Sequence, residues 1–148
     1  MGEKTVSETQ EIMLWKRFED GELGTPMVED YAREYERNTL VNPDELAIKE
    51  HKITIEFSYP LSVKVYLEFE KEGGFTNMDL LRCVYEGYKK IYDEEEAQAG
   101  DPGIYDMLYN RRPSHGKYGI WGHYMNDLYL EVINYNPEKR LCTLDIGS

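Results

Sequence analysis

The segment from Lys117 to Asp127 gathers the residue types in this chain that are best able to do chemistry. Two glycines bracket an Ile-Trp pair, a histidine follows directly, and an acidic residue comes four positions after it. A pair of His123 and Asp127 can act as an oriented general base. This pair carries one functional hypothesis, a small hydrolase or metal-binding enzyme with His123 and Asp127 as its catalytic residues. The alternative is structural, with Trp121 plugging the open end of a sheet and His123 satisfying backbone groups.

The sequence contains neither a complete metal-ligand motif nor a complete hydrolase motif. His115 and His123 lie eight residues apart, with Asp127 and Glu131 downstream. Two imidazoles and a carboxylate can ligate a divalent metal, but this spacing matches no standard ligand motif. Ser114, beside His115, has no glycine-flanked elbow after a strand, so no nucleophile is recognisable. We therefore predict neither a metal nor a cofactor.

The loop over residues 105–124 also combines aromatic and basic side chains in a way that is typical of protein interfaces. Aromatic rings beside arginines can equally stack a nucleobase. The structural alternative is an exposed loop whose arginines are merely solvated. The residues that we predict to bind a partner are Arg111, Arg112, His115, Tyr118, Trp121 and Tyr124.

The net charge limits the kinds of partner that we expect this protein to bind. The chain has 17 Lys and Arg against 29 Asp and Glu, which gives a net charge of −12. Phosphate backbones and anionic membranes attract clustered basic residues, so we expect neither direct nucleic-acid contact nor membrane binding. The leading hypothesis is a small acidic, non-enzymatic protein–protein interaction module. The acidity also supports a third hypothesis, an acidic mimic of nucleic acid that occupies a DNA-binding protein.

Length and cysteine usage bound the class of molecule. A chain of 148 residues suits one packed unit, and its apolar runs of a few residues exclude a membrane-spanning helix. Cys83 and Cys142 lie far apart, and the first residues lack the apolar core of a secretory signal. These features predict a cytoplasmic protein.

Two strands and a long helix give the strongest structural signals. Apolar residues alternate with polar ones over 52–57 and again over 63–70, which predicts an antiparallel hairpin with one buried face. Thr76 and Asp79 have the spacing of a capping box at the start of a helix over about 77–97. Its end is unfavourable, because residues 93–96 place four negative charges at the negative end of the helix dipole. Either this end is solvated and frayed, or a basic partner or a cation sits there.

The elements together predict an α+β fold. We expect a four-stranded antiparallel sheet built from two hairpins that flank the long helix, with an N-terminal helical arm. The arm, residues 1–48, is expected to carry helices over about 8–19 and 27–38, and residues 49–148 to form the core domain. In the second hairpin, Leu128, Leu130 and Val132 are expected to face inward.

The outer face of this sheet carries more apolar surface than a solvated face needs. We expect the N-terminal helices to cover it, with a homodimer as the rival cover. The outer residues are Tyr66, Tyr129, Ile133, Tyr135 and Leu141, and the covering residues are Trp15, Phe18, Tyr31 and Tyr35.

Four stretches of the chain carry a resemblance: Phe75-Thr76 with Leu80-Leu81, then Tyr88 to Glu95, Tyr118 to His123, and Asp127 to Glu131. Together they resemble an uncharacterised family that we associate with large DNA viruses of eukaryotes and related protist or plant open reading frames. The resemblance covers about residues 50–135. It implies no established activity, and for a viral protein it implies a location in the host cytoplasm or nucleus.

Overall fold

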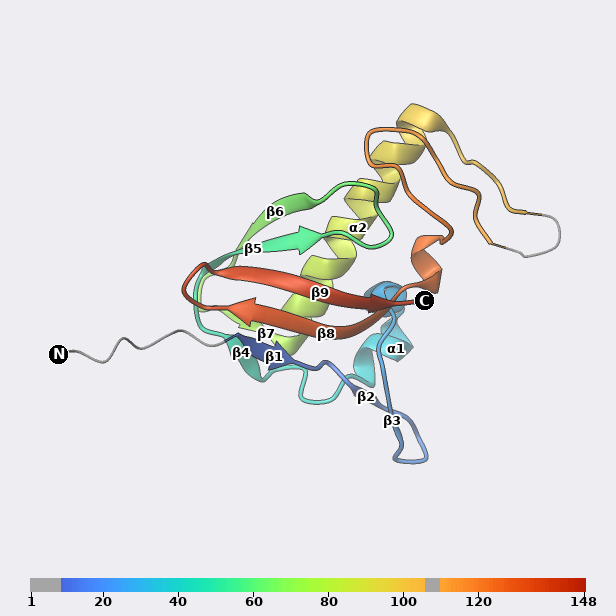
Figure 1. Ribbon diagram of the computed structural model, residues 1–148. Helices are drawn as coiled ribbons and strands as arrows, with labels where there is room; N and C mark the ends of the chain where they lie inside the picture. Colours follow the sequence, from blue (N-terminus) through green and yellow to red (C-terminus); the bar gives the residue numbers. More distant parts are fainter. Residues whose placement is uncertain (1–8, 106–109) are drawn as a thin grey trace.

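The computed structural model describes residues 9–105 and 110–148 of the chain. One long helix, α2, crosses behind a five-stranded sheet (Figure 1). Among the described residues, no helix is both long enough and apolar enough to cross a membrane. The elements are β1 (Gln10–Ile12), β2 (Lys16–Arg17), β3 (Leu23–Gly24), η1 (Val28–Ala32), α1 (Glu34–Asn38), β4 (Leu46–Ile48), β5 (Lys52–Phe57), β6 (Val65–Glu70), β7 (Phe75–Thr76), α2 (Asn77–Ala99), η2 (Met125–Asp127), β8 (Tyr129–Asn136) and β9 (Leu141–Gly147).

The main sheet has the strand order β1-β8-β9-β5-β6. The expected α+β class is confirmed, but the four-stranded antiparallel sheet is wrong in two respects. First, β1 adds a fifth strand by pairing with β8. Second, β5 and β9 run parallel, because the chain returns along α2 and a long loop before it forms the second hairpin.

The first hairpin and the long helix form as predicted. β5 and β6 pair in an unbroken register from Lys52↔Glu70 to Phe57↔Val65. At the start of α2, Thr76 and Asp79 each accept a hydrogen bond from the other's backbone amide, which confirms the capping box. A Cβ at Gly87 would lie 2.1 Å from the ring of Phe57, so glycine lets α2 approach β5 closely.

The helix expected over residues 8–19 is wrong. Alternate side chains turn inward along this segment, and Leu14 and Lys16 are both buried. That period of two belongs to an extended chain, and β1 and β2 occupy the segment. Lys16 is accommodated inside because its ammonium contacts the carboxylates of Asp30 and of Glu36, the latter at 2.6 Å.

The expected helix over 27–38 is present only as two short pieces, η1 and α1. Residues 9–48 are also continuous with the core of residues 49–148, so their packing does not set them apart as an arm. Four of their side chains join the same hydrophobic cluster as α2 and the main sheet, namely Leu14, Val28, Leu40 and Ile48.

A bulge in β8 changes which residues of the second hairpin face inward. The register with β9 shifts between Leu130 and Val132, so Leu130, Ile133 and Tyr135 are buried. We expected Val132 to face inward and Ile133 and Tyr135 to face outward, and the structure corrects this assignment. Within residues 9–48, the expected covering side chains do not bury the outer face: Trp15, Phe18 and Tyr35 are exposed, and the ring of Tyr31 lies 5.7 Å from that of Tyr85 on α2.

Candidate functional site

The loop after α2 folds back over the last turns of that helix, where Glu95 is completely buried (Figure 1). The Glu95 carboxylate accepts hydrogen bonds from the Ser114 hydroxyl at 2.5 Å and from the backbone amides of Gly116, Tyr118 and Gly119 at 3.0, 2.8 and 3.2 Å. A Cβ at Gly116 would lie 2.6 Å from Glu95 Oε1. One side chain thus ties the loop to the helix.

This network decides the charge state of Glu95. Burial alone would raise the pKa of its carboxyl group, but the hydrogen bonds from Ser114, Tyr118 and Gly116 hold the pKa below its usual value. The carboxylate is therefore ionised at neutral pH. The expected solvated and frayed terminus is wrong at Glu95, because donors of the loop bind its carboxylate and offset the negative end of the helix dipole. The alternative, a basic partner or a cation at this end of α2, stays a prediction.

Arg111 is also fully buried beside this network. Its Nη1 donates to the Ser114 hydroxyl oxygen at 3.3 Å, and its guanidinium carbon lies 5.6 Å from the ring centroids of both Tyr92 and Tyr124. Nε and Nη2 have no hydrogen-bond partner among the described residues. Arg111 was predicted to bind a partner, but the structure places it inside the loop.

The remaining predicted binding residues divide between interior and surface. Tyr118 is buried and donates to Glu94 at 2.5 Å; burial first, and then this bond, raise its pKa to about 12. Tyr124 is half-buried, and its hydroxyl donates to Asp101 at 2.8 Å. Arg112 and His115 are exposed.

Trp121 is a further predicted residue that the loop exposes, with 54 % of its surface accessible to solvent. Its backbone amide donates to Pro60 O at 2.9 Å, and its indole N–H donates to the Ser62 hydroxyl at 2.6 Å. Gly119 and Gly122, on either side of the Ile-Trp pair, have φ of +60° and +68°, a conformation that glycine adopts readily. The Trp121 side chain is therefore fixed by hydrogen bonds and at the same time exposed to solvent.

His123 and Asp127 approach each other without a hydrogen bond. The distance from Nδ1 to Oδ2 is 3.7 Å, while the backbone amide of Tyr124 donates to the same oxygen at 3.3 Å. The ring of Tyr59 lies 6.0 Å from that of His123. The described part of the chain holds no group of three or more His, Cys, Asp or Glu arranged for a metal ion.

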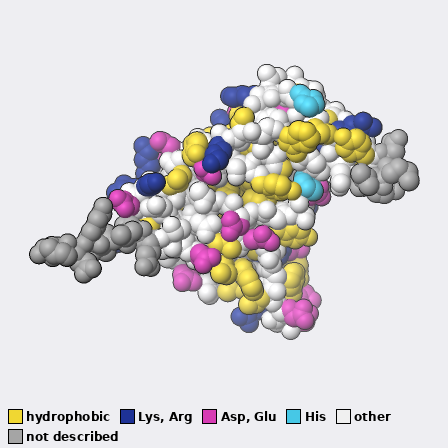
Figure 2. Space-filling model, viewed as in Figure 1, with side chains coloured by type: hydrophobic (Ala, Val, Ile, Leu, Met, Phe, Trp, Pro, Cys, Tyr) yellow, Lys and Arg dark blue, Asp and Glu magenta, His cyan; other side chains and the backbone are white. Residues whose placement is uncertain are grey.

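We call Tyr59, Trp121 and His123 the aromatic patch. The chain brings two separate segments together here, since an isolated bridge pairs Leu61 with Ile120. Tyr59 is 43 % exposed. Figure 2 shows hydrophobic side chains gathered beside two histidines on the face in view.

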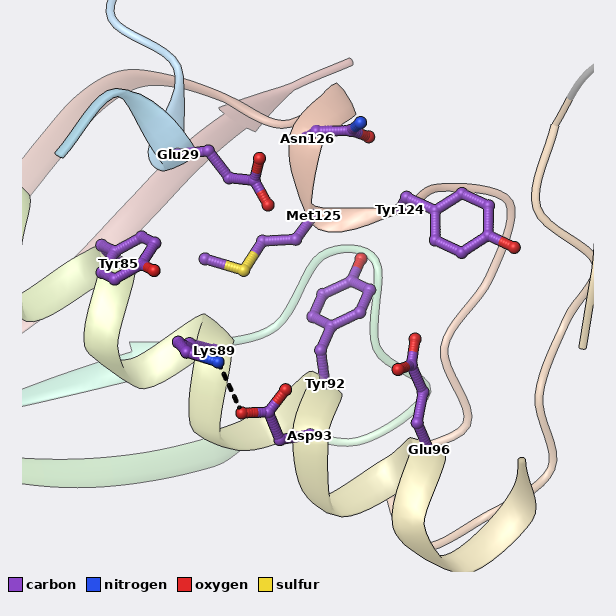
Figure 3. Close-up of a pocket in the computed structure, with 9 residues that line it drawn as sticks. All are labelled: Glu29, Tyr85, Lys89, Tyr92, Asp93, Glu96, Tyr124, Met125 and Asn126. Atoms are coloured by element: carbon purple, nitrogen blue, oxygen red, sulfur yellow. Dashed lines mark hydrogen bonds and ion pairs between the residues drawn. The ribbon is translucent and has the colours of Figure 1, made fainter. Parts of the chain in front are cut away.

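A separate hollow of about 260 Å³ lies between the second half of α2, η1 and η2 (Figure 3). Its carboxylates come from Glu29, Asp93 and Glu96, and Lys89 donates to Asp93 at 2.8 Å. Neither His123 nor Asp127 lines it. The hollow and the predicted catalytic pair are therefore different places.

Glu95 and Tyr59 are site residues that the sequence did not single out, and Ser114 was considered only as a nucleophile. Glu95 is one of four consecutive acidic residues, and its residue type does not distinguish it from its neighbours. Its position on the buried stripe of α2, four residues after Ile91, was the available clue.

Comparison of the chain with protein-family models, with curated proteins and with solved structures finds no match. The resemblance to an uncharacterised viral family therefore stays a prediction, and function has to be argued from the site.

Proposed function

We propose that this protein is a non-enzymatic protein–protein interaction module and that the aromatic patch is its contact surface. One observation carries the proposal: Trp121 is more than half exposed although both its backbone and its indole N–H groups are bonded to the neighbouring loop. Large exposed aromatic side chains dominate the energetics of many interfaces.

The anchoring of Trp121 matters as much as its exposure. A side chain that is already fixed loses little conformational freedom when a partner binds, so more of its contact area contributes to affinity. The base of the loop is fixed in a similar way, because the Glu95 carboxylate accepts hydrogen bonds from four donors of the loop.

The test compares Trp121→Ala with Trp15→Ala, a second tryptophan with 43 % of its surface exposed but far from the loop in sequence. Partners are identified by crosslinking in the native host, and their affinities for the purified full chain are measured by calorimetry. We expect Trp121→Ala to weaken binding at least tenfold and Trp15→Ala to leave it unchanged. Equal binding by both variants would overturn the proposal.

A hydrolase remains the second candidate, because His123 and Asp127 come within 3.7 Å. Turnover of any ester, amide or phosphoester substrate that is lost in both His123→Ala and Asp127→Asn would establish it. The acidic-mimic hypothesis rests on the net charge of −12 and on the acidic runs of the sequence.

A further inference from the structure

Strand β6 forms an open edge of the main sheet. It is the last strand in the order β1-β8-β9-β5-β6, and among the described residues it pairs only with β5, through six residue pairs. The opposite edge, β1, is only three residues long. Proteins usually protect edge strands by a bulge, a proline or an inward-pointing charge, and β6 has none of these.

The inward side chains of β6 are incompletely covered. Those of β5 are fully buried under α2, whereas Val65, Leu67 and Phe69 are only half-buried. Two hollows, of about 510 and 290 Å³, follow β6 on its helix side and share Leu67 and Lys90 as lining residues. A groove therefore runs along the open edge, with Leu67 at its centre and charged side chains such as Lys90 and Glu94 of α2 on its helix side.

The outward side chains carry opposite charges at the two ends of this edge. Lys64 stands exposed just before β6, and Glu70 stands exposed at its end. An antiparallel copy of the same strand, centred on Leu67, would place Lys64 opposite Glu70 of the second copy, twice by symmetry. In this register Val65 faces Phe69 of the second copy, so apolar residues also meet apolar residues.

We propose that β6 pairs with β6 of a second copy of this chain, forming a symmetric dimer with one continuous sheet. Each copy supplies the strand that the other lacks, and the added side chains cover the groove beside Leu67. The net charge of −12 on each copy opposes the dimer. At physiological salt that long-range repulsion is screened, whereas the local Lys64–Glu70 pairs lie in contact.

The test uses charge reversal at the paired positions of the full chain, followed by sedimentation analysis over micromolar to millimolar concentrations. The wild type is expected to shift from monomer to dimer across this range. Lys64→Glu and Glu70→Lys each place like charges opposite each other, so each is expected to weaken the dimer about tenfold. Both positions are exposed, and unchanged melting temperatures serve as the control for folding.

Mixing the two single variants is the decisive arm. A Lys64→Glu chain and a Glu70→Lys chain have opposite charges at both contacts, so the mixture is expected to dimerise as well as the wild type. The double variant Lys64→Glu/Glu70→Lys is expected to recover likewise. A wild type that stays monomeric throughout overturns the proposal, and so does a dimer that neither single variant weakens or that mixing fails to restore.

Discussion

At the scale of single residues, the buried carboxylate of Glu95 should matter most for the integrity of the loop. Gln cannot replace it well, because an amide presents one acceptor oxygen and two N–H donors to a pocket of donors. We expect Glu95→Gln to lower the free energy of unfolding by about 3 kcal/mol at pH 7, measured by urea denaturation.

The same residue predicts a pH dependence. The pKa of Glu95 is lower in the folded state than in the unfolded chain, where a glutamate has a pKa of about 4.3. The contribution of Glu95 to the free energy of unfolding is therefore fully present above that pH and is lost as the pH falls further. The stability difference between the wild type and Glu95→Gln should therefore shrink below that pH. A difference that stays constant down to pH 3 would contradict an ionised Glu95.

Arg111 differs from Glu95 although both are completely buried. Two of its three guanidinium nitrogens have no partner among the described residues, so its desolvation is poorly offset. We expect Arg111→Met to change the free energy of unfolding by less than about 1 kcal/mol, because an apolar side chain of similar length avoids that cost. A loss as large as that of Glu95→Gln would show that the charge itself is required.

At the scale of elements, the two strands of the first hairpin should respond differently to truncation. Phe57 on β5 is fully buried and packs edge-to-face on Tyr88 with ring centroids 5.0 Å apart, whereas Leu67 on β6 is half-buried. We expect Phe57→Ala to cost about 3–5 kcal/mol and Leu67→Ala about 1–2 kcal/mol in urea denaturation. Equal costs would mean that α2 covers both strands alike.

At the scale of the whole molecule, the N-terminal residues belong to the folding unit. Leu14, Val28 and Leu40 lie in the central core, and β1 pairs with β8. A chain that starts at residue 46 is therefore expected to lose at least about 4 kcal/mol of stability, seen as a lower urea midpoint. An unchanged midpoint would show that residues 9–45 contribute nothing to the core.

The sequence by itself determined the elements whose signals are local. Alternation over 52–57 and 63–70 defined the hairpin, and Thr76 with Asp79 defined the start of α2, because side-chain period and capping depend on near neighbours.

Only the tertiary structure decided the rest, because it depends on contacts between distant segments. β1 became a strand since β8 offered it an edge, and β9 met β5 in parallel after the crossover. Glu95 and Arg111 resemble surface residues in the sequence, where charge predicts exposure. Glu95 can be buried because a loop some twenty residues further along supplies hydrogen-bond donors to its carboxylate. Arg111 lies on that loop, where its guanidinium faces the rings of Tyr92 and Tyr124.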